Sequence, residues 1–331
     1  MGKNILRKNM DNLVENRILD IVKALATFLI VGSHSLPIFK NNLLDFYYGQ
    51  WLFRFCVPLF FISSGYFFGK MNDEKRKSYL KRIIAIYLIA TLIYLPFLLK
   101  TKCLFRIILN FAFGYHHLWY LNSLFFGLII IYFISKYFKF NNKNLIVLTI
   151  ILLFLGIFFD EYYKIINFPI FNKIDSFLNY IGGGRNFLFF AIPMLLTGLL
   201  ISKNINKILN MSIKTALLFL LMTLTFSFIE ATILKYLIRY NITIDLSLFN
   251  TIPAIFIFIV TFLIDNKKIL FDTRILRKTS DIIYIIHIWV IHTIRKLFTI
   301  NNMLIFLFSY LISFIISYFI VKFIDNFKKH N

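Results

Sequence analysis

Lys23 and His34 lie eleven residues apart in the first apolar segment of the chain, RILDIVKALATFLIVGSHS (residues 17–35). In a helix this spacing is within about 20° of three full turns, so the side chains share a face, about 16 Å apart along the axis. An imidazole suits proton transfer near neutral pH, and a lysine suits contact with phosphate. We expect one face of this helix to carry chemistry. The structural alternatives are a lysine that only reaches the headgroups and a histidine that only packs.

Further polar residues recur in later apolar segments at a similar predicted depth. They are Arg54, His117, Arg185, Asn186, Glu230 and His287. Arg54 stands four residues before Pro58, which should bend the helix. A charged group in the bilayer costs at least about 2.5 kcal/mol, so such groups usually face a wet interior. Their recurrence predicts a polar cavity beneath the outer leaflet, although any one of them could be an interfacial anchor.

The composition places these residues in a membrane protein. The chain has 331 residues, of which 59% are hydrophobic and 19% aromatic, with several apolar runs close to the length that spans a bilayer. Its net charge of +22 lies mostly in short loops, which argues against a nucleic-acid partner. The two cysteines, Cys56 and Cys103, imply neither a disulfide framework nor a metal site.

The apolar runs predict an all-α bundle of about ten transmembrane helices. Their ranges are 18–38, 51–68, 80–99, 118–138, 143–159, 186–202, 213–237, 246–264, 280–299 and 303–324. Segment 103–115 is too short to span and is expected to lie along the surface. The excess of Lys and Arg in alternate loops predicts that both termini are cytoplasmic. We expect one membrane domain over residues 1–331: an N-terminal segment 1–17, the bundle 18–324 and a tail 325–331.

Two glycine motifs accompany the polar residues. Gly182–Gly184 lacks the Lys–Ser/Thr of a phosphate-binding loop and is expected to be a flexible approach to a helix. GYFFG, from Gly65 to Gly69, is typical of closely packed helices.

Five motifs, in order, resemble those of the acyltransferase 3 family: RILDIVKALATFLIVGSHS, RFCVPLFFISSGYFF, HLWYLNSLFF, RNFLFFAIPMLLTGLLI and SDIIYIIHIWVI. That family comprises ten-helix membrane enzymes that O-acylate bacterial surface glycans. The resemblance implies an essential His34, and it carries over Arg54, Arg185 and Asn186. Where the family has Arg, this chain has Lys23, which keeps the charge but not the bidentate fork.

The resemblance implies transfer of an acyl group, with acetyl expected, from cytoplasmic acyl-CoA to a hydroxyl of a surface polysaccharide or lipid-linked sugar, at the plasma membrane. Three residues are predicted to be catalytic: His34 as base or covalent acyl carrier, Arg54 at the oxyanion and Glu230 orienting an imidazole. Donor or acceptor contacts are predicted for Lys23, His117, Arg185, Asn186, Tyr284 and His287. No metal and no permanently bound cofactor is expected.

A second resemblance leaves another function open. The RN…G pattern is also similar to the membrane domain of vancomycin-resistance serine racemases, which is linked to serine supply. A transporter or an amino-acid uptake domain predicts the same polar cavity without dependence on acyl-CoA. A purely structural scaffold leaves the buried polar groups unexplained and ranks last.

Overall fold

The computed structural model describes residues 16–100, 103–138, 141–162, 183–237, 245–266 and 269–330, and every regular element in these ranges is helical. Most of the predicted N-terminal segment lies outside the described residues, as do residues 163–182. The chain divides into two compact units. The first comprises Met1–Cys56, Met211–Leu220 and Phe256–Asn331, and the second comprises Val57–Asn210 and Leu221–Ile255. The single domain stays a prediction.

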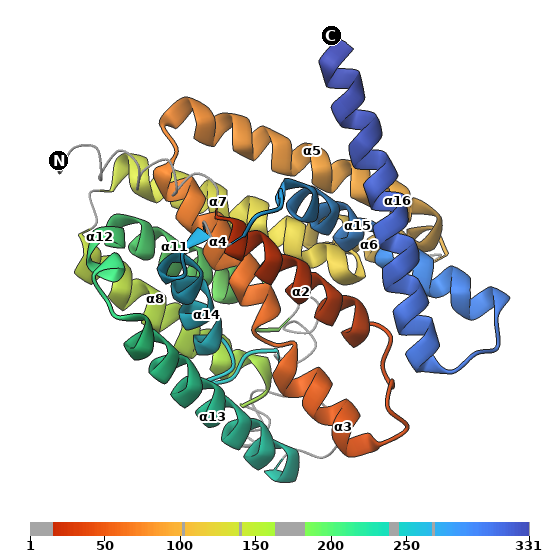
Figure 1. The fold of residues 1–331 in the computed structure, drawn as a ribbon, viewed down its shortest axis with the longest axis horizontal. Coiled ribbons are helices and arrows are strands. Elements are labelled where there is room, and N and C mark those ends of the chain that lie inside the picture. The colour runs from red at the N-terminus through yellow and green to blue at the C-terminus, as the bar shows by residue number, and fades with distance from the viewer. Residues whose placement is uncertain are drawn as a thin grey trace. The chain divides into compact units, whose positions relative to one another are not determined.

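The first unit is built on α2 (Arg17–Ser33), α15 (Arg274–Leu297) and α16 (Asn302–His330), which pack together although they come from opposite ends of the chain (Figure 1). All three contribute buried apolar side chains to one core, among them Val31, Ile283, Ile291 and Phe306. Between membrane helices, close van der Waals packing of such side chains is one of the forces that hold the helices together. α3 (Asn42–Tyr47) and the π-helical turn η1 (Tyr48–Leu52) follow α2.

The second unit contains most of the remaining helices. They are α4 (Cys56–Lys70), α5 (Asp73–Leu98), α6 (Leu104–Phe113), η2 (His116–Leu118), α7 (Trp119–Tyr137), α8 (Asn142–Ile157), η3 (Phe158–Tyr162), η4 (Phe187–Ala191), α11 (Ile192–Lys203) and α12 (Ile205–Leu209). α13 (Ile213–Leu237) and α14 (Ile252–Leu263) contribute residues to both units.

Asparagines mark where several helices begin. Asn16, Asn72, Asn141 and Asn186 each accept backbone N–H groups of the following turn through the side-chain oxygen. The first N–H groups of a helix have no partner within the helix, and a short amide side chain satisfies them. The polar breaks between apolar runs therefore set the starts of α2, α5, α8 and η4.

Glycines bring α4 and α11 into close contact. A Cβ on Gly65 would come 2.1 Å from the carbonyl oxygen of Leu195, and one on Gly198 would come 2.0 Å from that of Ile62. The backbones of the two helices therefore approach where both lack side chains, as in small-residue packing. The close packing predicted from GYFFG is confirmed at Gly65.

Six helical runs in the described residues are long and apolar enough to cross a membrane: Asn42–Lys70, Asp73–Leu98, His116–Tyr137, Asn142–Asp160, Ile213–Leu237 and Asn302–Phe327. Each of the ten predicted ranges contains a helix. However, α11 and α14 are short, with 12 residues each, and α2 has 17. The protein is an all-helical, multi-pass membrane protein. The count of ten spans and the side of the termini stay predictions.

Candidate active site

Two histidines predicted from distant motifs meet in the first unit. His34 caps the C-terminal end of α2, where its backbone N–H donates to the carbonyl of Ile30 at 3.2 Å, and its side chain is partly exposed. His287, on α15, is fully buried. The centres of the two imidazole rings are 5.2 Å apart. Tyr284, also on α15, has its ring 6.2 Å from that of His287. Three of the predicted site residues therefore lie together.

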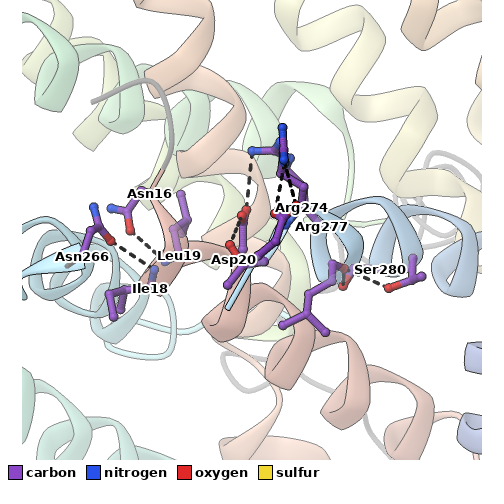
Figure 2. A network of polar contacts seen from close by, with 12 residues as sticks. Asn16, Ile18, Leu19, Asp20, Asn266, Arg274, Arg277 and Ser280 are labelled. Carbon is purple, nitrogen blue, oxygen red and sulfur yellow. Dashed lines mark hydrogen bonds and ion pairs between the residues drawn. The ribbon is translucent and has the colours of Figure 1, made fainter. Parts of the chain in front are cut away.

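The opposite end of α2 is held by a polar network (Figure 2). Asn16 donates to the carbonyl of Thr261 at 3.0 Å, and Asn266 accepts the backbone N–H of Ile18 at 3.3 Å. Asp20 is buried, accepts the hydroxyl of Thr273 at 2.8 Å, and lies 3.8 Å from the guanidinium of Arg277. These contacts fix the start of α2 against the segment that leads into α15.

Lys23 belongs to the same charged group. It is partly buried on α2, and Asp281 and Asp20 are the acidic side chains that act on it electrostatically, against Arg277. Nearby, Arg274 donates hydrogen bonds to Asp272 and lowers the pKa of that carboxyl to about 2, so it stays ionised at neutral pH. Lys23 is a cation held among several compensating charges.

Asp20→Leu is expected to destabilise the protein by about 2 kcal/mol or more, because it removes a buried carboxylate and leaves its basic partners uncompensated. The matched control is Asp325→Leu, which breaks the 2.6 Å pair of Asp325 with Lys278, whose side chains are 41% and 45% exposed. An exposed pair is worth at most about 1 kcal/mol. Thermal unfolding in detergent measures both. Equal losses in the two variants would contradict the structural role of Asp20.

Arg54 stands where the second predicted helix is interrupted. Residues 53–55 form a turn between η1 and α4, just before Pro58. Arg54 is buried, donates to Oε1 of Gln50 at 2.9 Å, and lies 4.9 Å over the ring of Phe53. Such a partly desolvated guanidinium is suited to stabilising a developing negative charge. Its proximity to His34 stays a prediction.

In the second unit, Arg185 forms a polar site with two residues. Its guanidinium lies 3.4 Å from a carboxylate oxygen of Asp245 and 5.4 Å over the ring of Trp119. Asn186 follows, donates to the carbonyl of Gly183 at 2.7 Å, and caps η4. Arg185 is exposed and Asn186 is buried, so Arg185 can meet a ligand while Asn186 shapes the turn beneath it.

Asp160 holds the partner of Arg185 in place. Its Oδ2 accepts the backbone N–H groups of Asp245 at 2.8 Å and Leu246 at 3.0 Å. Gly184 packs against it: a Cβ there would come 2.7 Å from the carbonyl of Gly156 and 2.9 Å from Cβ of Asp160. In the described part of the glycine run, Gly183 has φ +60° and Gly184 has no room for a side chain. The run therefore serves close packing beside Arg185 more than flexibility.

Glu230 anchors the same segment from α13. Its carboxylate accepts hydrogen bonds from the hydroxyls of Ser247 at 2.7 Å and Tyr162 at 2.9 Å, and from the backbone N–H groups of Leu248 at 2.7 Å and Phe249 at 2.8 Å. Four donors make the carboxylate a structural anchor of the segment before α14. The catalytic role expected for Glu230, orienting an imidazole, stays a prediction.

Glu230→Gln is expected to loosen this segment, because an amide offers one acceptor oxygen where the carboxylate offers two. Amide hydrogen exchange at Leu248 and Phe249 should rise at least about tenfold, since a hydrogen bond to a charged group contributes about 1.5–3 kcal/mol. Glu74→Gln, at an exposed position in the first turn of α5, is the control. Loss of acyl transfer with unchanged exchange would favour the catalytic role instead.

His117 lies in a strained turn at the start of α7. Gly114, with φ +91°, ends α6, and His116 has φ +50°, which L-residues rarely adopt. His117 is buried, with its ring 4.9 Å from that of Tyr94. Strained backbone of this kind is often found at ligand sites. The gathering of His117, Arg185 and Glu230 with the first unit's histidines around one cavity stays a prediction.

Three acidic residues were not predicted from the sequence. Asp245 and Asp281 act on Arg185 and Lys23, and Asp160 holds the segment that carries Asp245, but nothing in their spacing relates them to these partners. The motif FFDEYY (residues 158–163), with an acid at the end of an apolar run, was the available signal for Asp160. Within the described ranges no three His, Cys, Asp or Glu side chains group as metal ligands. That no metal is used stays an expectation.

The fold and the site define a class: an all-helical, multi-pass membrane protein with an imidazole pair and, in the described residues, a buried guanidinium group at Arg54. A family model described as an acyltransferase domain, that of the acyltransferase 3 family, matches residues 16–322. The chain therefore belongs to the acyltransferase 3 family.

Curated relatives match part of the chain. An amino-acid racemase of Enterococcus faecalis is 29% identical over 206 residues, covering 57% of this chain and 28% of the relative. A serine/alanine racemase of Enterococcus gallinarum is 26% identical over 265 residues, covering 74% of this chain and 37% of the relative. The chain thus spans about a third of the length of these relatives. No solved structure matches it.

Proposed function

We propose that this protein transfers an acyl group, acetyl in the first instance, from acyl-CoA to a hydroxyl of a surface polysaccharide or related envelope glycan at the plasma membrane. The family match over residues 16–322 is the observation that carries this function. The histidine pair at the end of α2 supports it, because acyl transfer to a hydroxyl needs a base or a nucleophile beside the acyl group.

His34 acts by one of two routes. As a general base, it takes the proton of the acceptor hydroxyl while the oxygen attacks the thioester carbonyl, and the proton then passes to the departing CoA sulfur. As a nucleophile, it attacks the thioester, CoA leaves as the thiol, and the acyl-imidazole passes its acyl group to the hydroxyl. Both routes build negative charge on the carbonyl oxygen, and in this proposal Arg54 stabilises that charge.

Lys23 and the remaining polar residues bind the substrates. Lys23 meets the phosphates of acyl-CoA. These phosphates then balance part of the positive charge of Lys23 that Asp281 and Asp20 otherwise balance. His117, Arg185, Asn186, Tyr284 and His287 are the other donor and acceptor residues. Arg185 suits a polar acceptor because its side chain is 43% exposed. No metal and no permanently bound cofactor takes part in either route.

A second function is favoured by the relatives, which are named as racemases of amino acids. In that case the domain handles an amino acid such as serine and transfers no acyl group. The polar residues would then line a transport path. The two functions differ in whether acyl-CoA is consumed.

Mass spectrometry of envelope glycans tests the first function. Cells that express the protein should carry glycans heavier by one acetyl group per modified sugar than cells that lack it. Uptake of radiolabelled serine, measured in the same two strains, tests the second. Identical glycans in the two strains, together with serine uptake that depends on the protein, would contradict acyl transfer and support transport.

A further inference from the structure

The backbone around His287 fixes which of its ring nitrogens carries a hydrogen. Nδ1 lies 2.8 Å from the carbonyl oxygen of Tyr284 and 3.0 Å from that of Ile283, one turn earlier on α15. Carbonyl oxygens only accept hydrogen bonds, so Nδ1 must be the donor. In the neutral ring the hydrogen is therefore on Nδ1, and Nε2 carries the lone pair. A buried, neutral imidazole in this tautomer is a fixed hydrogen-bond acceptor.

This acceptor, Nε2 of His287, belongs to a ring that lies next to the ring of His34. The two ring centres are 5.2 Å apart and the planes are inclined by 47°, which excludes a parallel stack. Each nitrogen of an imidazole lies about 1 Å from the ring centre, so an N–H···N bond of about 3 Å places the two centres about 5 Å apart. The observed separation therefore leaves room for one N–H···N bond between the two imidazoles.

The two rings differ in what they can touch. His287 has none of its surface exposed and lies between Ile283 and Ile291, which are 1% and 4% exposed, on the face of α15 that packs in the core. His34 stands at the open end of α2 and is partly exposed. Substrate can reach His34 but not His287. Any effect of His287 on the reaction must therefore pass through His34.

We propose that His287 is the positioning residue of His34: in the reacting enzyme, Nε2 of His287 accepts the N–H of the His34 ring, a bond that the structure itself does not contain, and so aims the other His34 nitrogen, with its lone pair, at the substrate. This assignment rests on the proposed function. It gives His287 a positioning role in place of the direct contact with substrate that was expected from the sequence. It serves both routes, because a base and a nucleophile need the same lone pair. The arrangement follows the logic of a catalytic triad, with a neutral imidazole where the triad has a carboxylate.

Two substitutions separate positioning from packing. In His287→Asn the amide keeps a donor near Nδ1 for the carbonyls of α15 but has no acceptor that reaches His34. In His287→Gln the longer side chain places an amide oxygen near the position of Nε2. We expect kcat of His287→Asn to fall about 10²- to 10⁴-fold with KM nearly unchanged. The kcat of His287→Gln should be at least about tenfold higher than that of His287→Asn.

The control is His292→Asn, an exposed histidine on the same helix, which should keep wild-type kcat. Thermal unfolding in detergent accompanies each kcat, so that loss of folding is not taken for loss of activity. Wild-type kcat in folded His287→Asn, or equal kcat in His287→Asn and His287→Gln, would overturn the assignment.

A second measurement does not depend on activity. Nitrogen-15 spectra of histidine-labelled protein report which ring nitrogen carries the hydrogen, and His34→Ala assigns the His34 signals. We expect one tautomer of His34 in the wild type and a mixture in His287→Asn. The same single tautomer in both would refute the positioning role. If wild-type membranes transfer no acyl group, the proposed function fails, and the spectra still decide whether His287 fixes the tautomer.

Discussion

Membranes that carry His34→Ala are expected to lose acyl transfer by at least about a hundredfold, since positioned proton transfer alone contributes about 10²- to 10⁴-fold. His34 is the partly exposed imidazole of the pair, and no other group in this account takes the hydroxyl proton or carries the acyl group. The loss should fall on kcat rather than on KM for acyl-CoA, because the proposed function assigns contact with the donor phosphates to Lys23 and not to His34.

Ser33→Ala is the matched control for this variant. Ser33 precedes His34 and donates its hydroxyl to the carbonyl of Ile30 at 2.8 Å, within its own helix. Its removal leaves the end of α2 in place, so transfer should stay near the wild-type rate. Transfer of radiolabelled acetyl groups to isolated glycan measures both variants. Undiminished transfer by folded His34→Ala would remove His34 from the mechanism.

Gly198→Ala is expected to be the most damaging substitution to the fold. The added Cβ would lie 2.0 Å from the carbonyl oxygen of Ile62 and 2.7 Å from the backbone nitrogen of Tyr66. These are backbone atoms of α4, so no side chain can swing aside, and the helices must separate. Overpacking of ordinary cores costs about 1–3 kcal/mol of stability. We expect Gly198→Ala to destabilise the protein by about 3 kcal/mol or more.

Gly127→Ala is the control for that prediction. A Cβ there would lie 2.7 Å from Cδ1 of Leu195, the end of a flexible side chain that can change rotamer. The melting temperature in detergent and the yield of monodisperse protein compare the two variants. Equal stability of Gly198→Ala and Gly127→Ala would show that α4 and α11 do not approach as closely as the structure has them.

The sequence predicted the helices because a bilayer imposes a simple rule: backbone polar groups must be satisfied within apolar segments. It did not predict the π-helical turns at Tyr48–Leu52, Phe158–Tyr162 and Phe187–Ala191. Hydropathy counts apolar residues and is insensitive to one extra residue per turn. Asp160 lies within the second of these turns, and Arg54 and Asn186 stand beside the other two. Such π-bulges often mark functional positions.

Only part of the candidate site was predicted from the sequence. Spacing predicted that Lys23 and His34 share one helix: Lys23 lies on α2 and His34 caps its C-terminal end, while their shared face stays a prediction. The motif order brought His287 into the same set. The hydrogen bonds of Glu230 and Asp160 depend on where residues 245–249 lie after folding, and no helical period relates those positions. The positions of residues along one helix could therefore be predicted in advance, whereas the partners of carboxylates that anchor a distant segment could not.

Transfer across a sealed vesicle tests the central claim most directly. Purified protein is reconstituted with radiolabelled acetyl-CoA on the side of the termini and envelope glycan on the other, beside vesicles with His34→Ala. This account predicts label on the glycan in the wild-type vesicles and almost none with the variant. Label that stays on acetyl-CoA in both, while wild-type vesicles accumulate serine, would contradict it.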